Sequence, residues 1–171
     1  KKELAKALGV EMGARSSRTA RTAAALESRA PVPDYRILIY GPGNREYGAT
    51  PTWYSVETQP GIQTVLTCLD EHSWVCRIAP GKETTLYVPH LSADEDLREE
   101  PLAQSLVKQG RLFAMDVRGR GESRPNSCGG NYLTPYGSDY FYAYFSEMYG
   151  ESMLGRRTFD VLRVLDLLES R

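Results

Sequence analysis

The strongest structural signal in this chain is the stretch Gly110-Arg-Leu-Phe-Ala-Met-Asp-Val-Arg-Gly-Arg-Gly-Glu-Ser123. Residues 112–117 form a short apolar run whose length suits a buried strand, and Asp116 is the only charge within it. The chain then turns on Gly119 and Gly121, which can adopt backbone angles that are closed to residues with a side chain. We therefore expect a buried strand that ends in a tight polar loop.

A second strand and a helix are expected upstream of this stretch. Residues 84–89 are rich in β-branched and aromatic side chains, and residues 95–109 place leucine and valine on one broad face of a helix. Pro101 falls inside the helical pattern, so the helix either begins near Pro101 or is kinked there. Strand, helix and strand in this order indicate one crossover of an α/β sheet, in which ligands bind at the carboxyl ends of the strands.

The residues before this crossover predict antiparallel strands. Residues 35–40 resemble a strand closed by Gly-Pro-Gly, and the alternating segments 53–58 and 62–69 flank a Gln-Pro-Gly turn that is typical of a β-hairpin. Towards the other end, residues 155–171 place apolar side chains in a wide helical stripe. The predicted fold class is therefore α/β, with antiparallel N-terminal strands leading into a parallel sheet that has flanking helices.

An unusual aromatic run lies at residues 140–145, where five of six side chains are aromatic. Aromatic runs pack into a core more often than they bind a ligand, and we favour that interpretation. The alternative is that Tyr140, Tyr142 and Tyr144 stack on a sugar ring.

The first 30 residues differ from the rest of the chain. They hold seven Lys or Arg residues against three acidic ones and are rich in alanine. We divide the chain into an N-terminal basic helical segment, residues 1–30, and a main domain, residues 31–171. A basic segment could bind nucleic acid, but we favour a solvated outer helix.

Composition and charge argue against several classes of function. The chain has 171 residues, of which 25% are charged and 41% hydrophobic, as in one globular domain with a sizeable core. Its formal net charge of -1 gives no electrostatic reason to expect nucleic acid or an anionic membrane as a partner. No apolar run approaches the roughly 20 residues that span a bilayer. We expect no metal, no cofactor and no signal peptide, since neither metal-ligand spacings nor an apolar segment after Lys2 occur.

The three cysteines, Cys68, Cys76 and Cys128, fit no disulfide framework. Cys68 and Cys76 could face each other across a hairpin, but we favour unpaired, half-buried thiols. Cys128 has no downstream histidine that would support it as a nucleophile, so we interpret it as a surface-loop thiol.

Several segments resemble one family. Asp116-Val-Arg-Gly-Arg-Gly-Glu-Ser123 resembles the D-x-R-G-x-G-x-S turn after the fourth strand of α/β-hydrolases. Residues 86–96 are similar to the third strand and its loop in bacterial acetyl-xylan-esterase-like members, and residues 137–142 and 154–162 to later segments. The resemblance extends over roughly residues 50–171. It implies a partial α/β-hydrolase fold, a carbohydrate ester as substrate, and an extracellular or periplasmic setting.

The hydrolytic machinery of this family is only partly present. Such enzymes carry a serine in a G-x-S-x-G turn and then an acid and a histidine, in that order. The chain contains no G-x-S-x-G, and its two histidines, His72 and His90, precede the place where the serine would stand. We expect the serine nucleophile to lie beyond Arg171, and the 171-residue chain alone to be inactive.

The resemblance also indicates candidate site residues. The backbone N–H groups of Leu91 and Ser92, in the loop after the third strand, correspond to an oxyanion-hole donor, and Leu91 stands where many members carry glycine. The remaining candidates are expected to hold the loops near the site, with Asp116 and Arg118 as a structural pair; they are His90, Asp116, Arg118, Gly119, Gly121 and Ser123.

Three functions follow, in order of preference. The first is the N-terminal portion of a carboxylic-ester hydrolase, completed by the remainder of the domain or by a second chain. Such a partner is expected because an unfinished parallel sheet leaves an open edge. The alternative is a non-catalytic α/β module that binds carbohydrate or another partner. The third is a nucleotide-binding domain, disfavoured because Arg124 occupies the position of the third fingerprint glycine.

Overall fold

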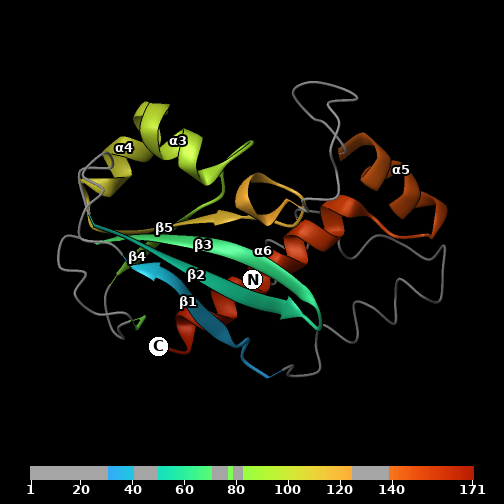
Figure 1. Ribbon diagram of the computed structural model, residues 1–171, viewed down its shortest axis with the longest axis horizontal. Helices are drawn as coiled ribbons and strands as arrows, with labels where there is room; N and C mark the ends of the chain where they lie inside the picture. Colours follow the sequence, from blue (N-terminus) through green and yellow to red (C-terminus); the bar gives the residue numbers. More distant parts are fainter. Residues whose placement is uncertain (1–30, 41–49, 71–76, 79–82, 125–138) are drawn as a thin grey trace.

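The computed structural model describes residues 31–40, 50–70, 77–78, 83–124 and 139–171 (Figure 1). The strands are β1 (Tyr35–Tyr40), β2 (Thr50–Gln59), β3 (Ile62–Asp70), β4 (Thr84–Tyr87) and β5 (Arg111–Asp116). The helices are α3 (Ala93–Glu99), α4 (Pro101–Val107), α5 (Asp139–Met148) and α6 (Met153–Glu169), and η2 is a single 3-10 turn at Gly121–Ser123.

The strands form one mixed sheet in the order β1-β2-β3-β5-β4. β1, β2, β3 and β5 pair antiparallel in succession, whereas β4 pairs parallel with β5. The predicted hairpin joins β2 to β3, and its Gly61 has a φ of 76° that residues with a side chain rarely adopt. The α/β class and the antiparallel N-terminal strands are confirmed, and β4 with β5 is the one parallel pair among the described strands.

The predicted helix over residues 95–109 is divided into α3 and α4. Glu100 between them has φ -82° and ψ 116°, an extended conformation. The ring of Pro101 disfavours the helical conformation for the residue before it, while Pro101 itself fits the first position of α4. The proline therefore produces a complete break. Pro89 has a related effect on the strand predicted at 84–89, which ends at Tyr87.

β5 is buried on both faces and organises the core. Phe113 and Met115 face α6, in a cluster that also contains Tyr54, Val56, Leu66, Cys68, Val164 and Leu167. Leu112 and Ala114 face the opposite side, in a cluster with Leu69, Ala93, Leu97 and Ala103. Figure 1 shows the same arrangement, with α3 and α4 on one side of the sheet and α6 on the other. The alternation along β5 thus produces three layers.

The aromatic run forms α5, and our interpretation of it as core is wrong. None of the residues of α5 is buried, and Tyr140, Tyr144 and Phe145 are 50–56% exposed. The periodicity explains the result, because five aromatics within six helical positions point in nearly all directions around the axis, and only one direction can face the body. Aromatic density by itself did not indicate burial.

Some predictions lie outside the described residues. These concern the basic segment 1–30, His72, Cys76 and Cys128, so the division at residue 30 and the expectation that Cys68 and Cys76 are unpaired stay predictions. Cys68 itself lies in the core on β3, so the prediction that its thiol is half-buried is wrong. Among the described helices none is long and apolar enough to cross a membrane.

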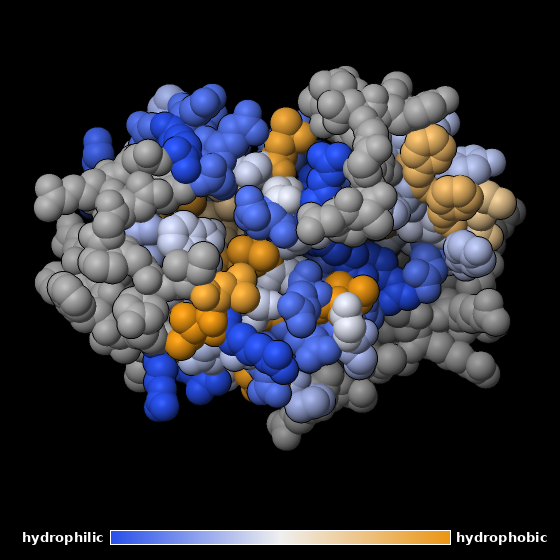
Figure 2. All heavy atoms as spheres, viewed as in Figure 1, coloured by the Kyte–Doolittle hydropathy of each residue, from blue (hydrophilic) through white to orange (hydrophobic). Residues whose placement is uncertain are grey.

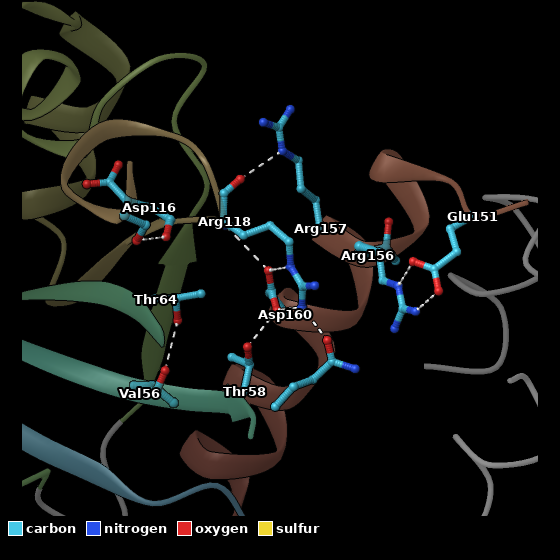
Figure 3. A network of polar contacts seen from close by, with 12 residues as sticks. Val56, Thr58, Thr64, Asp116, Arg118, Glu151, Arg156, Arg157 and Asp160 are labelled. Carbon is cyan, nitrogen blue, oxygen red and sulfur yellow. Dashed lines mark hydrogen bonds and ion pairs between the residues drawn. The ribbon is translucent and has the colours of Figure 1, made fainter. Parts of the chain in front are cut away.

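A buried ion pair fixes α6 against the sheet (Figure 3). The Asp160 carboxylate, in the middle of α6, is fully buried and accepts from the guanidinium of Arg118, with Nε at 2.6 Å. It also accepts from the hydroxyl of Thr58 at 2.6 Å, and Arg118 donates further to Oε1 of Gln59 at 2.9 Å. This network joins α6, the end of β2 and the loop after β5, which satisfies the charge of a carboxylate that no water reaches.

We expect Asp160→Asn to lower the free energy of unfolding by about 3 kcal/mol, because it leaves the Arg118 cation without its counter-charge in a largely buried place. The control is Glu151→Gln, the same chemical change in an ion pair with Arg156 whose side chains are 47% and 27% exposed. It should cost less than about 1 kcal/mol. Urea denaturation measures both, and equal losses would contradict the role of the buried network.

Candidate functional site

Two loops meet at the carboxyl ends of the parallel strands. One follows β4 and leads into α3, and the other follows β5 and contains η2. The N–H of Gly121 in the second loop donates to the carbonyl oxygen of Leu91 in the first, at 3.0 Å. Ligand sites of open α/β sheets form where such loops converge. The structure therefore brings together most of the residues that were selected from the sequence.

The side chain of Asp116 joins the two loops. It is 1% exposed, and its carboxylate accepts hydrogen bonds from the N–H of Ala93 at 2.8 Å and from the N–H of Glu122 at 3.0 Å. Ala93 is the first residue of α3, and Glu122 lies in η2. One buried carboxyl group thus contacts both loops through their backbones.

Burial raises the pKa of Asp116 from its ordinary value of 3.8 to about 6. The two backbone N–H donors favour the ionised form and lower the pKa, while the carboxylates of Glu122 and Asp94 raise it. Desolvation outweighs the donors, so this group titrates in mild acid. No cation is among the groups that shift it.

Gly121 is required by its close approach to Asp116. Its φ is 44°, and a Cβ built on it would lie 2.3 Å from Oδ1 of Asp116. Gly119 also has a positive φ, of 75°, but a Cβ there would meet its nearest neighbours only at 3.5 Å. The two glycines of the sequence motif therefore differ: Gly119 allows the turn, and Gly121 also makes room for the carboxyl group.

Ser123 continues the pairing of β3 with β5 past its last backbone pair. Its Oγ accepts from the N–H of Val65 at 2.8 Å and donates to the carbonyl oxygen of Asp116 at 2.6 Å. Val65 and Asp116 are the terminal partners of the β3–β5 register. The hydroxyl therefore bridges the two strands at the point where they separate, and it holds the loop close to the sheet.

A hydrogen bond to the carbonyl oxygen of Leu91 fixes the orientation of the Leu91–Ser92 peptide. The carbonyl oxygen of Leu91 accepts from Gly121, and in a trans peptide the N–H of Ser92 points the opposite way. Within the described residues, the N–H groups of Leu91 and Ser92 make no hydrogen bond. Both residues are half-buried, and Ser92 is the N-cap of α3. The arrangement offers an oriented backbone donor at the edge of the site.

His90 is exposed and its position is set by its backbone. Its N–H donates to Oδ2 of Asp96 at 3.3 Å, and the same oxygen accepts from the hydroxyl of Tyr87 at 2.8 Å. Burial, followed by the Asp96 contact, raises the pKa of Tyr87 to about 12. Tyr87 thus remains a neutral donor that ties the end of β4 to α3.

A second acidic residue, Asp139, anchors α5 beside this loop. Its two oxygens pair with Arg120 and with Arg157 of α6, both at 2.6 Å, and Nε of Arg157 donates to the carbonyl oxygen of Arg118 at 3.2 Å (Figure 3). Sequence reasoning did not select Asp139, Arg157 or Asp160 as site residues, although the segments 137–142 and 154–162 that contain them carry part of the family resemblance. Their pairing could not be predicted from a local pattern, because each partner lies at least 18 residues away.

The three tyrosines considered for sugar stacking lie on α5 and not in the two loops of the candidate site. Tyr140 and Tyr144 are exposed on α5, with ring planes 9° apart and centroids 6.5 Å apart, and Tyr142 is half-buried. Figure 2 shows further hydrophobic side chains at the surface over α5. The helix that carries them is linked to the candidate site by its first residue, Asp139, which pairs with Arg120 of the loop after β5.

The described residues contain no cluster of His, Cys, Asp and Glu that could hold a metal ion. What this region can do chemically is present a backbone N–H to a developing negative charge.

Replacing Gly121 tests the packing of this site. Gly121→Ala should lower the free energy of unfolding by about 2–4 kcal/mol, through the positive φ and the collision with the Asp116 carboxyl. Gly61→Ala is the matched control, since Gly61 also has a positive φ but nothing within 4 Å of the added Cβ. It should cost only about 1 kcal/mol. Thermal denaturation compares them, and an equal cost would exclude the steric contribution of Asp116.

No family model matches this chain, and no curated protein matches it. Among solved structures, it is similar to a Bacteroides fragilis protein that is provisionally described as an acetyl xylan esterase. The two superpose with a TM-score of 0.57 at 18% sequence identity, over 90% of this chain and 42% of that protein. This chain therefore spans less than half the length of its structural neighbour. The likeness shows a shared fold.

Proposed function

We propose that this chain is the N-terminal portion of a carboxylic-ester hydrolase of the α/β-hydrolase fold, and that it supplies the oxyanion-binding side of the active site. The observation that carries the proposal is the backbone N–H of Ser92, a half-buried residue. Its orientation is set by the hydrogen bond to the Leu91 carbonyl oxygen, and it makes no hydrogen bond within the described residues. A donor of this kind stabilises the tetrahedral intermediate of acyl transfer.

Two further observations support the assignment. The site lies at the carboxyl ends of the parallel strands β4 and β5, where open α/β sheets bind ligands. The fold likeness to the Bacteroides fragilis protein extends over 90% of this chain. The name of that neighbour and the sequence resemblance together favour an acetylated carbohydrate as the substrate.

In the proposed reaction a serine outside this chain gives its proton to a histidine, also outside this chain, and the serine oxygen attacks the ester carbonyl. The carbonyl π electrons move to oxygen, and the N–H of Ser92 donates to the resulting oxyanion. Collapse of the intermediate breaks the bond to the sugar oxygen, which takes the proton from the histidine and leaves as the alcohol, and water then releases acetate from the acyl-serine. His90, Asp116, Arg118, Gly119, Gly121 and Ser123 hold the two loops and do not contact the reacting atoms.

The sheet suggests where the remainder of the enzyme attaches. Among the described strands β4 has a neighbour on one side only, β5. A strand from the remainder of the domain, or from a second chain, would pair with the outer edge of β4 and bring the nucleophile towards the two loops.

The first test concerns the isolated 171-residue chain. It should hydrolyse p-nitrophenyl acetate no faster than buffer, because the sequence holds no G-x-S-x-G nucleophile turn. Turnover that a fluorophosphonate abolishes would contradict the proposed division of the machinery.

The second test concerns the oxyanion donor in the enzyme completed with its downstream sequence. Ser92→Ala should retain activity on acetylated xylan, because the donor is the backbone. An α-hydroxy acid with the alanine side chain, placed at position 92, substitutes oxygen for the N–H and should lower kcat on the order of a hundredfold with little change in KM. Equal rates for these two variants would exclude Ser92 as a donor.

A second candidate function is carbohydrate binding without catalysis. It is favoured by the exposure of Tyr140 and Tyr144, whose nearly parallel rings lie on the outer side of α5. Titration with xylo-oligosaccharides distinguishes the two proposals. Binding that the double substitution Tyr140→Ala, Tyr144→Ala removes, in a full-length protein without esterase activity, would favour the binding module.

A further inference from the structure

A single buried carboxyl group connects the two loops of the candidate site. Asp116 accepts from the N–H of Ala93 and from the N–H of Glu122. Ala93 directly follows Ser92, so this contact also fixes the segment that carries the candidate donor. The N–H of Gly121, in the loop after β5, donates to the carbonyl oxygen of Leu91. Because Gly121 has no Cβ, it also leaves the space that the Asp116 carboxyl group fills.

The surroundings of this carboxyl group contain acids but no paired cation. Glu122 of η2 and Asp94 of α3 are the charged groups that act on it, and both are negative. Arg118 extends away from it to Asp160, as Figure 3 shows, and Arg120 pairs with Asp139. On the β3 side Asp116 is paired with Val65, and the hydroxyl of Ser123 bridges the Val65 N–H and the Asp116 carbonyl oxygen. Burial opposes the ionisation of Asp116 most strongly, and the two neighbouring charges add to it, while the N–H groups of Glu122 and Ala93 favour ionisation without outweighing burial.

We propose that Asp116 is a proton-linked clasp: a positioning residue whose protonated form holds the loops after β4 and β5 together most firmly, and whose ionisation favours their separation. The proposal concerns the same site as the proposed function. It does not require that the protein hydrolyse an ester, because the clasp is a property of the two loops.

The direction follows from linkage. With the loops closed the pKa of Asp116 is about 6, whereas separation of the loops admits water and returns it towards its ordinary value of about 4. The closed state binds the proton more tightly, so its extra stability is present in full below about pH 4 and is lost as the pH rises through about 6. A difference of about two pKa units corresponds to a change on the order of a hundredfold in the closing equilibrium.

A protonated Asp116 carboxyl group can still accept both of the backbone hydrogen bonds that join the loops. It keeps acceptor capacity on its oxygens for the N–H groups of Ala93 and Glu122, and it removes the charge that burial penalises. An amide cannot do the same, because Asp116→Asn places an NH₂ group where one of the two N–H donors needs an acceptor. Aspartic acid is therefore the side chain that allows both a closed and a proton-dependent arrangement.

The test is the exchange of the Ala93 and Glu122 amide hydrogens, followed by NMR between pH 4.5 and 7.5 and corrected for intrinsic exchange. Protection of both amides should fall in parallel by about twentyfold, steeply between pH 4.5 and about 6, and should level off above about pH 6. Asp116→Asn should abolish this pH dependence. Asp94→Asn removes a neighbouring carboxylate, so the fall should persist there and level off at a slightly lower pH.

Protection that is independent of pH in the unmodified protein, or that rises with pH, would overturn the proposal. If Asp116→Asn does not fold, the ¹³C shift of the Asp116 carboxyl group in the unmodified protein still decides, since a midpoint near pH 4 would also overturn it. Absence of esterase activity in the completed enzyme would reject the proposed function alone, because the exchange measurement involves no substrate.

Discussion

A carboxyl group buried at the end of β5 is the interaction on which the rest of the site depends. β5 is enclosed by β3 and β4 at its edges and by helices on both faces, so its last residue, Asp116, has no access to water. A buried polar group must find partners within the protein. The partners are backbone N–H groups of two other segments, and satisfying the carboxyl group therefore also positions the two loops.

The protein buries a second carboxylate in a different manner. Asp160 is surrounded by donors that include the guanidinium of Arg118, and its charge is compensated by a cation. Asp116 has backbone donors but no cation beside it, so burial raises its pKa, and two acidic neighbours add to the effect. Only three residues lie between Arg118, which pairs with Asp160, and Glu122, whose N–H donates to Asp116. One loop thus combines a rigid ion pair, which holds it to α6, with a titratable contact that holds it to α3.

Much of the architecture could be predicted from local patterns. The apolar run of β5, the alternation in β2 and β3, the Pro-Gly turn between them and the stripe of α6 each reflect a periodicity that a short window contains. The position of the helix break follows from Pro101 alone. The exposure of α5 could not be predicted, because it depends on whether another element covers the helix, and five aromatics in six positions define no single face.

The sequence alone determined the elements, the loop glycines and the identity of the residues near the site, because turn angles and strand periodicity are local properties of the chain. It also showed that these 171 residues contain no G-x-S-x-G turn. The tertiary structure alone decided the partners of those residues. Arg118 pairs with Asp160 across 42 positions, and Asp116 accepts from Ala93 across 23. Such contacts depend on how β4, β5 and α6 pack in space. Packing brings together residues that are far apart in the chain, and no periodic pattern in the sequence links them.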